Sequence, residues 1–350
     1  MTQYYNTLNQ ELAAYPKPSL PVQTESLERY EVWARKARAK LWELLGLDRM
    51  RPCAPDAQKL EEKQLDGYRR EKWIVQTEPG IYVSLYLLIP DGLKPRERRP
   101  VVMCPHGHTG AKDSTSGTVS IPEMEDNISI HRYDYGRKAA QMGFVAVCMD
   151  ARGHGERREP DQWGESAQKR LHGSCAWLNH MAIPLGRCVA GMWTWDLMRL
   201  ADWLLTLDYV CGNHLATMGL SGGGLQSLYF SALDERVCYT VISGYFYGFK
   251  EALLELHNCS CNYVPHLWEY FDIGEIGSLI APRPLVIETG DEDPLNGRSG
   301  LNNVIPYVDQ VRKVFALYGR EDDIYHDIFH GPHRWNGKAS MERLEKYMKV

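Results

Sequence analysis

The stretch from His214 to Phe230, HLATMGLSGGGLQSLYF, constrains the fold of this chain more than any other part of the sequence. An apolar run that ends at Met218 leads into a glycine-rich turn around Ser221, and a helix-compatible segment follows. A serine at the tip of so sharp a turn has a strained backbone, and side chains two residues before and after it would collide with the neighbouring strand and helix. Gly219 and Gly223 occupy those two positions, so the stretch predicts a strand, a tight turn and a helix.

Short apolar runs rich in valine and isoleucine recur on both sides of this turn. They are RRPVVMCPHG, FVAVCMD, HLATMGLS, CYTVISG and RPLVIETGDED. Two earlier runs, 70–76 and 81–90, flank a Glu-Pro-Gly turn and predict a hairpin, and a last strand is predicted over 313–318. Continuous apolar strands separated by helical segments predict an α/β fold with a mostly parallel central sheet and helices on both faces.

The chain divides into an N-terminal extension and one large domain. Residues 1–65 predict a proline-containing arm, an amphipathic helix from Ser26 to Gly46 and a charged connector, packed on the core. Residues 66–350 predict the α/β domain, with insertions at about 156–186 and 244–279. Both insertions follow strands, and segments that leave the carboxyl ends of strands build the ligand crevice of an open sheet. We therefore expect the insertions to form a pocket wall or lid.

Charge and composition exclude several classes of partner. Lys+Arg 40 against Asp+Glu 45 gives a net charge of −5, so there is no basic excess for nucleic acid or an anionic membrane. The N-terminus shows no signal-peptide pattern and no apolar run is long enough to span a bilayer, which favours a cytoplasmic protein. The nine scattered cysteines suit reduced thiols. The close pair Cys259 and Cys261 is interpreted as packing residues, with a redox or metal role as the alternative.

Ser221 is a candidate nucleophile, because GLSGG fits the G-x-S-x-G elbow and the following helix directs its free N–H groups at an oxyanion position. The alternative is a glycine-rich turn with a capping serine. A serine nucleophile needs a carboxylate and then a histidine later in the chain. Three carboxylates follow the strand at 284–287, and Asp293 is preferred because the residues before it, Asp291 and Glu292, fit a solvated turn.

The base must come from a loop after the last strand. His326, His330 and His333 lie there, and His333 is preferred because its surroundings predict an irregular loop. The oxyanion donors are assigned to Gly222 and to His108, in the PHGH turn after an earlier strand.

Several other side chains are candidates for contact with a substrate. Arg152 and His154 lie in the turn DARGHGE, where an Asp-Arg pair alternatively braces the loop. His106 is added from the PHGH turn, with a metal site formed by His106, His108 and His154 as an alternative. The aromatic candidates in the second insertion are Tyr245, Tyr263 and Trp268.

Together these motifs resemble the α/β-hydrolase superfamily, and within it the acetyl xylan esterase and dienelactone hydrolase-like group of bacterial esterases. The similar segments, over residues of about 70–337, are PHGH, DARGHGE, GMWTWDLMRLADWL, GLSGGG, CSCNYVPHLWEYFD, APRPLVIETGDEDP and HGPHRWNG. The resemblance implies the α/β-hydrolase fold, a triad of Ser221, Asp293 and His333, hydrolysis of carboxylic esters and no cofactor. No metal site is assigned, because no carboxylate lies at a convincing spacing from the histidines of the PHGH and DARGHGE turns.

The leading hypothesis is a serine esterase that removes acetyl groups from sugars or cleaves other small esters. A serine peptidase, amidase or acyltransferase is the alternative, since three successive glycines also fit peptidases of the prolyl oligopeptidase type. A non-catalytic binding protein on the same scaffold is the third hypothesis. The expected partner is a small-molecule or oligosaccharide ester, and the N-terminal arm suggests a homo-oligomer.

Overall fold

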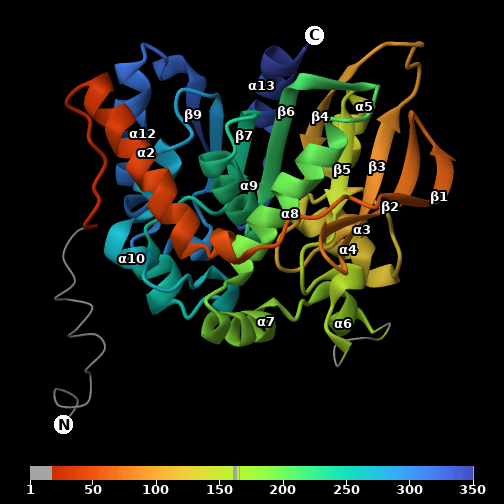
Figure 1. Ribbon diagram of the computed structural model, residues 1–350, viewed down its shortest axis with the longest axis horizontal. Coiled ribbons are helices and arrows are strands. Elements are labelled where there is room, and N and C mark those ends of the chain that lie inside the picture. Colours follow the sequence, from red (N-terminus) through yellow and green to blue (C-terminus); the bar gives the residue numbers. More distant parts are fainter. Residues whose placement is uncertain (1–17, 161–163, 165, 350) are drawn as a thin grey trace.

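The fold, a computed structural model that describes residues 18–160, 164 and 166–349, is built on one nine-stranded sheet (Figure 1). Its order is β1-β2-β3-β5-β4-β6-β7-β8-β9. The strands are β1 (Gln58–Leu65), β2 (Tyr68–Glu78), β3 (Ile81–Pro90), β4 (Arg99–Met103), β5 (Val145–Met149), β6 (Val210–Leu220), β7 (Val237–Ser243), β8 (Leu285–Gly290) and β9 (Ile324–Phe329). The first three strands and the β3–β5 pair are antiparallel, and β5, β4, β6, β7, β8 and β9 run parallel. The predicted α/β-hydrolase architecture is confirmed.

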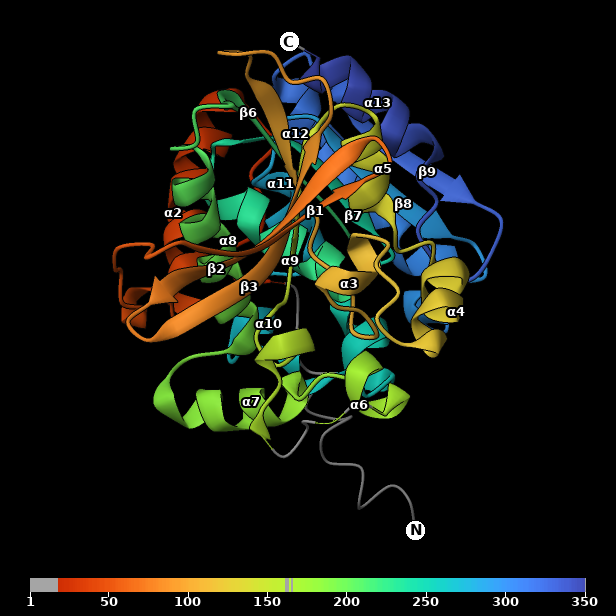
Figure 2. The ribbon, with the colours of Figure 1, turned by 90° about the vertical axis from the view of Figure 1, so that its right-hand side faces the viewer.

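Helices cover both faces of the sheet, as Figure 2 shows with the sheet nearly edge-on. One face carries α2 (Leu27–Leu44), α8 (Val189–Leu204), α9 (Gly222–Leu233), α11 (Ile273–Ser278) and α12 (Ile305–Leu317). The other carries α5 (Tyr135–Gln141) and α13 (Lys338–Met348). Successive side chains of β4 point to opposite faces of the sheet. Val101 and Met103 therefore pack in one cluster with α8, and Val102 packs in another with α5. Buried apolar clusters therefore lie against both faces of the sheet.

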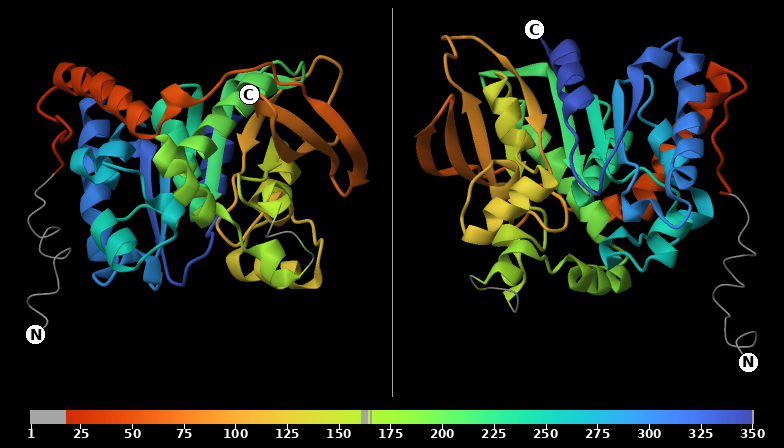
Figure 3. Two further views of the ribbon diagram at one scale, coloured as in Figure 1. Left: turned by 60° about the horizontal axis from the view of Figure 1, so that its bottom comes forward. Right: turned by 180° about the vertical axis from the view of Figure 1, so that it is seen from behind.

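The predicted N-terminal helix is confirmed. The side chain of Ser26 caps α2 by accepting a hydrogen bond from the N–H of Arg29 (3.2 Å), and Gly46 follows the helix in the left-handed conformation. Tyr30 anchors α2 by donating to the carbonyl of Ser278 (2.7 Å), and α2 lies beside α12 in both views of Figure 3. The predicted arm falls mostly on residues outside the described range, so an oligomer formed through it stays a prediction.

Two predicted elements are wrong. The predicted connector contains β1, whose residues from Gln58 to Gln64 are all exposed, so it shows no apolar pattern and is held by its pairing with β2. The predicted strand over 313–318 lies almost entirely in α12, where Val308, Val311 and Phe315 are buried at helical spacing. The true last strand is β9.

Short helices from the insertions and loops lie beyond the carboxyl ends of the parallel strands. The first insertion holds α6 (Ala167–Leu171) and α7 (Cys175–Ala182), the second holds α10 (Leu267–Tyr270), and the chain between β4 and β5 holds α3 (Lys112–Thr115) and α4 (Pro122–His131). Among the described residues, every helix is too short or too polar to cross a bilayer.

Candidate functional site

Ser221 lies at the junction of β6 and α9 with φ 59° and ψ −120°, a backbone conformation that residues with a side chain rarely adopt. Its N–H donates to the carbonyl of Ser243 (2.8 Å), which fixes the turn against β7. A Cβ at Gly219 would lie 2.4 Å from the carbonyl carbon of Gly223, and a Cβ at Gly223 would lie 2.2 Å from the carbonyl oxygen of Pro105. Glycine is therefore required at both positions, and the strand, tight turn and helix are as predicted.

His333 and Asp293 form a short hydrogen-bonded pair. Nδ1 of His333 lies 2.6 Å from Oδ2 of Asp293, whose residue is 4% exposed. The other carboxylate oxygen of Asp293 accepts from the N–H of Leu295 (2.9 Å). Asp291 instead accepts from the N–H of Gly331 (2.9 Å) at the surface, beside His330. Of the acidic residues in this loop, Asp293 is thus the one that orients the His333 imidazole.

The segment that carries His333 is held by a buried carboxylate at the end of β8. Glu288 accepts from the N–H groups of Asn336 (3.1 Å) and Gly337 (2.9 Å) and from the hydroxyl of Ser340 (2.6 Å). Burial raises the pKa of Glu288 above its usual range. A Cβ at Gly244 would lie 2.8 Å from the His333 ring, so the bare backbone after β7 makes room for the imidazole.

The PHGH loop after β4 passes directly over Ser221. A Cβ at Gly107 would lie 3.1 Å from the Cβ of Ser221 and 2.4 Å from the Tyr133 hydroxyl. A Cβ at Gly222 would lie 3.5 Å from the backbone nitrogen of His108. Gly222 is the first residue of α9, where N–H groups have no acceptor within the helix. The backbone nitrogen of His108 therefore lies close to Gly222, the residue that follows Ser221.

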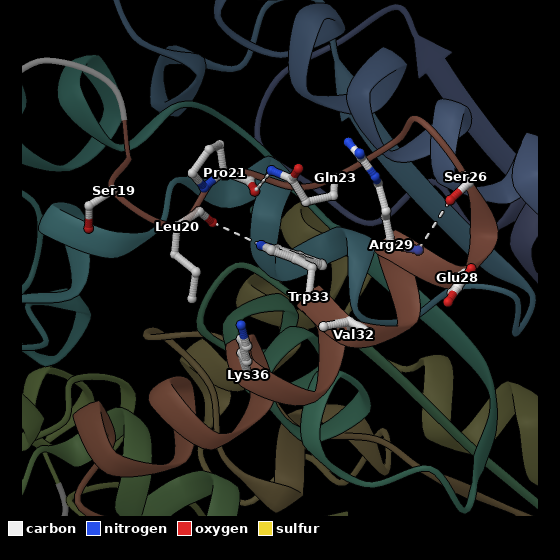
Figure 4. A pocket seen from close by; sticks show the side chains of 10 residues that line it. All are labelled: Ser19, Leu20, Pro21, Gln23, Ser26, Glu28, Arg29, Val32, Trp33 and Lys36. Carbon is white, nitrogen blue, oxygen red and sulfur yellow. Dashed lines mark hydrogen bonds between the residues drawn. The ribbon is translucent and has the colours of Figure 1, made fainter.

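A cavity of about 340 Å³ joins these groups. Ser221 and His333 line it together with His108, Thr109, His131, Tyr133, His172, Gly173, Cys175, Asn258, Cys259 and Leu295. A larger hollow of about 590 Å³ lies between α2 and the chain before it, and Figure 4 shows Trp33 there donating to the carbonyl of Leu20 (3.1 Å). That hollow contains none of the predicted site residues, so the smaller cavity is the candidate site.

The residues predicted to contact a substrate lie outside the lining of this cavity. Arg152 is buried, with its guanidinium paired to Asp196 (2.7 and 2.9 Å) and Glu78 (2.8 Å). It therefore braces the loop, although its partners are not the neighbouring Asp150. His106 is also buried, its Nδ1 2.7 Å from the Gly107 carbonyl and its Nε2 accepting from the N–H of Ala151 (3.1 Å).

The other predicted contacts also have packing roles. The ring of His154 is buried against Trp193, with a centroid distance of 5.9 Å, and burial lowers the pKa of His154 well below its usual value. Tyr245 is buried, Tyr263 donates to the carbonyl of Leu253 (2.7 Å), and Trp268 packs on the core.

Sequence reasoning missed most of the cavity lining. His131 and Tyr133 come from the end of α4 and the turn after it, and His172 follows α6. Burial raises the pKa of Tyr133 to about 12, and its neutral hydroxyl lies 3.2 Å from the Thr109 hydroxyl. Of this lining, only His172, Gly173, Cys175, Asn258 and Cys259 lie in the two insertions that were predicted to form a pocket wall.

Four sulfur and nitrogen ligand atoms converge at one edge of the same cavity. They belong to His108, Cys175, Cys259 and Cys261, and all lie within 4.8 Å of one another. In the sequence, Cys259 and Cys261 have no further cysteine or histidine at metal-binding spacing, whereas the fold brings His108 and Cys175 to them from far along the chain.

Comparisons with known proteins agree with this fold. The sequence model of the Abhydrolase family matches residues 16–296. The chain is 27% identical over 303 residues to "Putative hydrolase YtaP" of Bacillus subtilis (strain 168), covering 81% of this chain and 89% of that protein. Its fold is similar to that of a "putative acetyl xylan esterase" from Bacteroides fragilis NCTC 9343, with a TM-score of 0.77, 19% identity, and 94% and 82% of the two chains covered.

A glucuronoyl esterase from Solibacter usitatus has the same fold, with a TM-score of 0.67, 14% identity, and 95% and 97% of the two chains covered. At these identities the structural neighbours establish the fold alone. The family match extends over most of the sequence and includes Ser221 and Asp293. The chain therefore belongs to the Abhydrolase family.

Proposed function

We propose that this protein is a serine carboxylic ester hydrolase that works through an acyl-enzyme. The observation that carries the proposal is the meeting of a strained Ser221 and an Asp293-oriented His333 in one cavity. Strained backbone at a site of this kind persists when the position of the side chain matters for function. A carboxylate-bound imidazole is the base that a serine hydroxyl needs.

In the first half of the reaction, Oγ of Ser221 attacks the acyl carbonyl and its proton passes to Nε2 of His333. Asp293 accepts the hydrogen bond from Nδ1–H and stabilises the imidazolium that forms. The backbone N–H groups of Gly222 and His108 donate to the oxyanion of the tetrahedral intermediate. The intermediate collapses when His333 returns the proton to the leaving alcohol. Water then attacks the acyl-enzyme by the same route and releases the acid.

The proposed substrates are small esters, with acetylated sugars first. The cavity of about 340 Å³ lies near the lower end of the usual range for ligand sites, and its imidazole, hydroxyl and amide groups suit a polar alcohol portion. The names of structural neighbours, acetyl xylan esterase and glucuronoyl esterase, support the ester class and a carbohydrate partner. Peptidase, amidase or acyltransferase action is less well supported, because these neighbours are named as esterases.

Hydrolysis of p-nitrophenyl acetate by purified variants tests the proposal. Ser221→Ala and His333→Ala should each lower kcat by about 10⁴-fold or more, because the members of a triad act as a unit. His330→Ala is the matched control, since His330 is exposed at the surface three residues away, and it should retain activity. Undiminished turnover by Ser221→Ala would contradict the proposal. A parallel panel of acetyl to feruloyl esters and short peptides would define the substrate class.

A further inference from the structure

The convergence of His108, Cys175, Cys259 and Cys261 has a geometry that ordinary packing does not require. Nε2 of His108 lies 2.9 Å from Sγ of Cys261. Sγ of Cys259 lies 3.3 Å from Sγ of Cys261 and 3.5 Å from Sγ of Cys175. The residues come from three separate segments, yet each directs its ligand atom at the same point, and all four atoms lie within 4.8 Å of one another.

These distances suit the corners of one tetrahedron. With Zn–S bonds of about 2.3 Å and a Zn–N bond of about 2.0 Å, a tetrahedral site separates its sulfur atoms by about 3.8 Å and its nitrogen from sulfur by about 3.5 Å. The three separations given above are about 0.3 to 0.6 Å shorter than these tetrahedral values, and the remaining ones are within 4.8 Å, so small side-chain movements would admit the ion. Three cysteines and one histidine are a common ligand set for structural zinc, and they leave no position open.

We propose that these four residues form a structural zinc site at the wall of the cavity. The thiolates of Cys175, Cys259 and Cys261 and Nε2 of His108 would each supply one bond. A disulfide explains the cluster less well, because it would join two of the sulfurs and leave a third thiol and the imidazole directed at the same point. All nine cysteines are free thiols in the structure.

The surroundings of the cluster suit a closed site. Cys175 and Cys261 are buried, and the side-chain amide of Asn262 donates to Sγ of Cys261 (3.7 Å). Asn179 on α7 donates to the carbonyl of Ser260 (2.6 Å), so the first insertion is already tied to the C-x-C segment. Hydrogen bonds of this kind orient metal ligands and limit the access of water.

The proposed zinc would join three of the segments that build the cavity. His108 belongs to the loop over Ser221, Cys175 begins α7 of the first insertion, and Cys259 lies in the second insertion. All three also line the cavity. The metal would thus fix both insertions to the loop that carries the His108 backbone nitrogen. The site itself does not depend on the proposed esterase function, whereas any effect of zinc on catalysis does.

Metal content of the full-length protein tests the proposal. Protein purified from zinc-supplemented medium without a metal-binding tag should contain about one zinc per chain by elemental mass spectrometry. Cys259→Ser and Cys261→Ser should each lower the content at least severalfold. Cys211→Ser is the matched control, because Cys211 also lies next to a histidine nitrogen (3.2 Å from Nδ1 of His214) but outside the cluster. It should retain the metal.

Two measurements on the unchanged chain cover the case in which the variants do not fold. Removal of zinc with a chelator should lower Tm, and reloading with Co²⁺ should give the visible absorption of tetrahedral cobalt bound to thiolates. Thiol counting in denaturant should find nine. Folded wild-type protein that contains no zinc after supplementation and does not take up Co²⁺, or that has a disulfide within the cluster, would overturn the proposal. Fluorophosphonate labelling of Ser221 in such protein would leave the esterase proposal standing.

Discussion

Replacing Ser221 with glycine should stabilise the protein relative to replacing it with alanine. Alanine keeps the Cβ atom, and with it the strain of φ 59° and ψ −120°. Glycine removes that strain, which costs on the order of 1–3 kcal/mol for a residue in a sparsely populated region. The greater conformational freedom of glycine in the unfolded chain offsets this gain by lowering the free energy of unfolding by about 0.4–1 kcal/mol. The Ser221→Gly variant should therefore unfold with a free energy about 1 kcal/mol higher than that of Ser221→Ala.

Urea unfolding followed by tryptophan fluorescence measures this difference, since the chain has ten tryptophans. Ser120 provides the control, because it is exposed and its φ is not in the left-handed region. There the order should reverse, with glycine less stable than alanine by about 0.4–1 kcal/mol. If glycine is also the less stable replacement at position 221, the strain assigned to the turn is refuted. Both Ser221 variants should lack esterase activity.

Three further predictions follow from other side chains. On p-nitrophenyl acetate, Asp293→Asn should lower kcat by about 10⁴-fold because His333 loses its carboxylate partner, whereas Asp291→Asn should leave kcat nearly unchanged. Equal losses of kcat in the two variants would show that the acid is misassigned. Burial lowers the pKa of His326 to about 4, so the stability linked to its neutral form is fully present above the unfolded pKa of about 6.5 and is lost as pH falls toward 4. Urea unfolding should show the free energy of unfolding falling by on the order of 2–3 kcal/mol over this range, and His326→Gln should make that fall smaller. The same pH profile in the variant and the wild type would contradict this prediction. Lys112→Met removes the ammonium that lies 2.8 Å from the buried Asp150 carboxylate, and should lower the free energy of unfolding by about 3–5 kcal/mol, measured in urea. Adding Asp150→Asn to that variant should partly restore the stability, whereas a loss under about 1 kcal/mol for Lys112→Met would contradict the buried pairing.

The buried half of the fold was predictable from the sequence. The parallel strands β4 to β8 appear as continuous apolar runs because both of their faces are covered. The glycines around Ser221 indicate a turn that has no room for side chains. The edge strand β1 of the antiparallel part of the sheet was harder to predict from the sequence. An exposed strand such as β1 has no apolar pattern of its own, and its conformation comes from its neighbour. The short run at 313–318 has no clear period, so its burial on a helix face could not be separated from that of a strand.

The candidate site divides in the same way. The chain order of serine, acid and histidine directed attention to Asp293 and His333, and the structure brings these two side chains together. The wall of the cavity was not predictable, because it is assembled from irregular segments far apart in the chain. Cys175 and Cys259, 84 residues apart, show this most clearly. Spacing rules for metal ligands detect near neighbours and miss a site that forms only when loops meet.

Covalent labelling of the wild-type protein with a fluorophosphonate probe tests the central claim most directly. The probe reacts with a serine only when a neighbouring base activates its hydroxyl. Peptide mass spectrometry should find one adduct per chain, on Ser221, and the rate of p-nitrophenyl acetate hydrolysis should fall in proportion to labelling. His333→Ala should label far more slowly. An unlabelled Ser221 in protein that still hydrolyses the ester, or an adduct on another serine that tracks the loss of activity, would contradict the account.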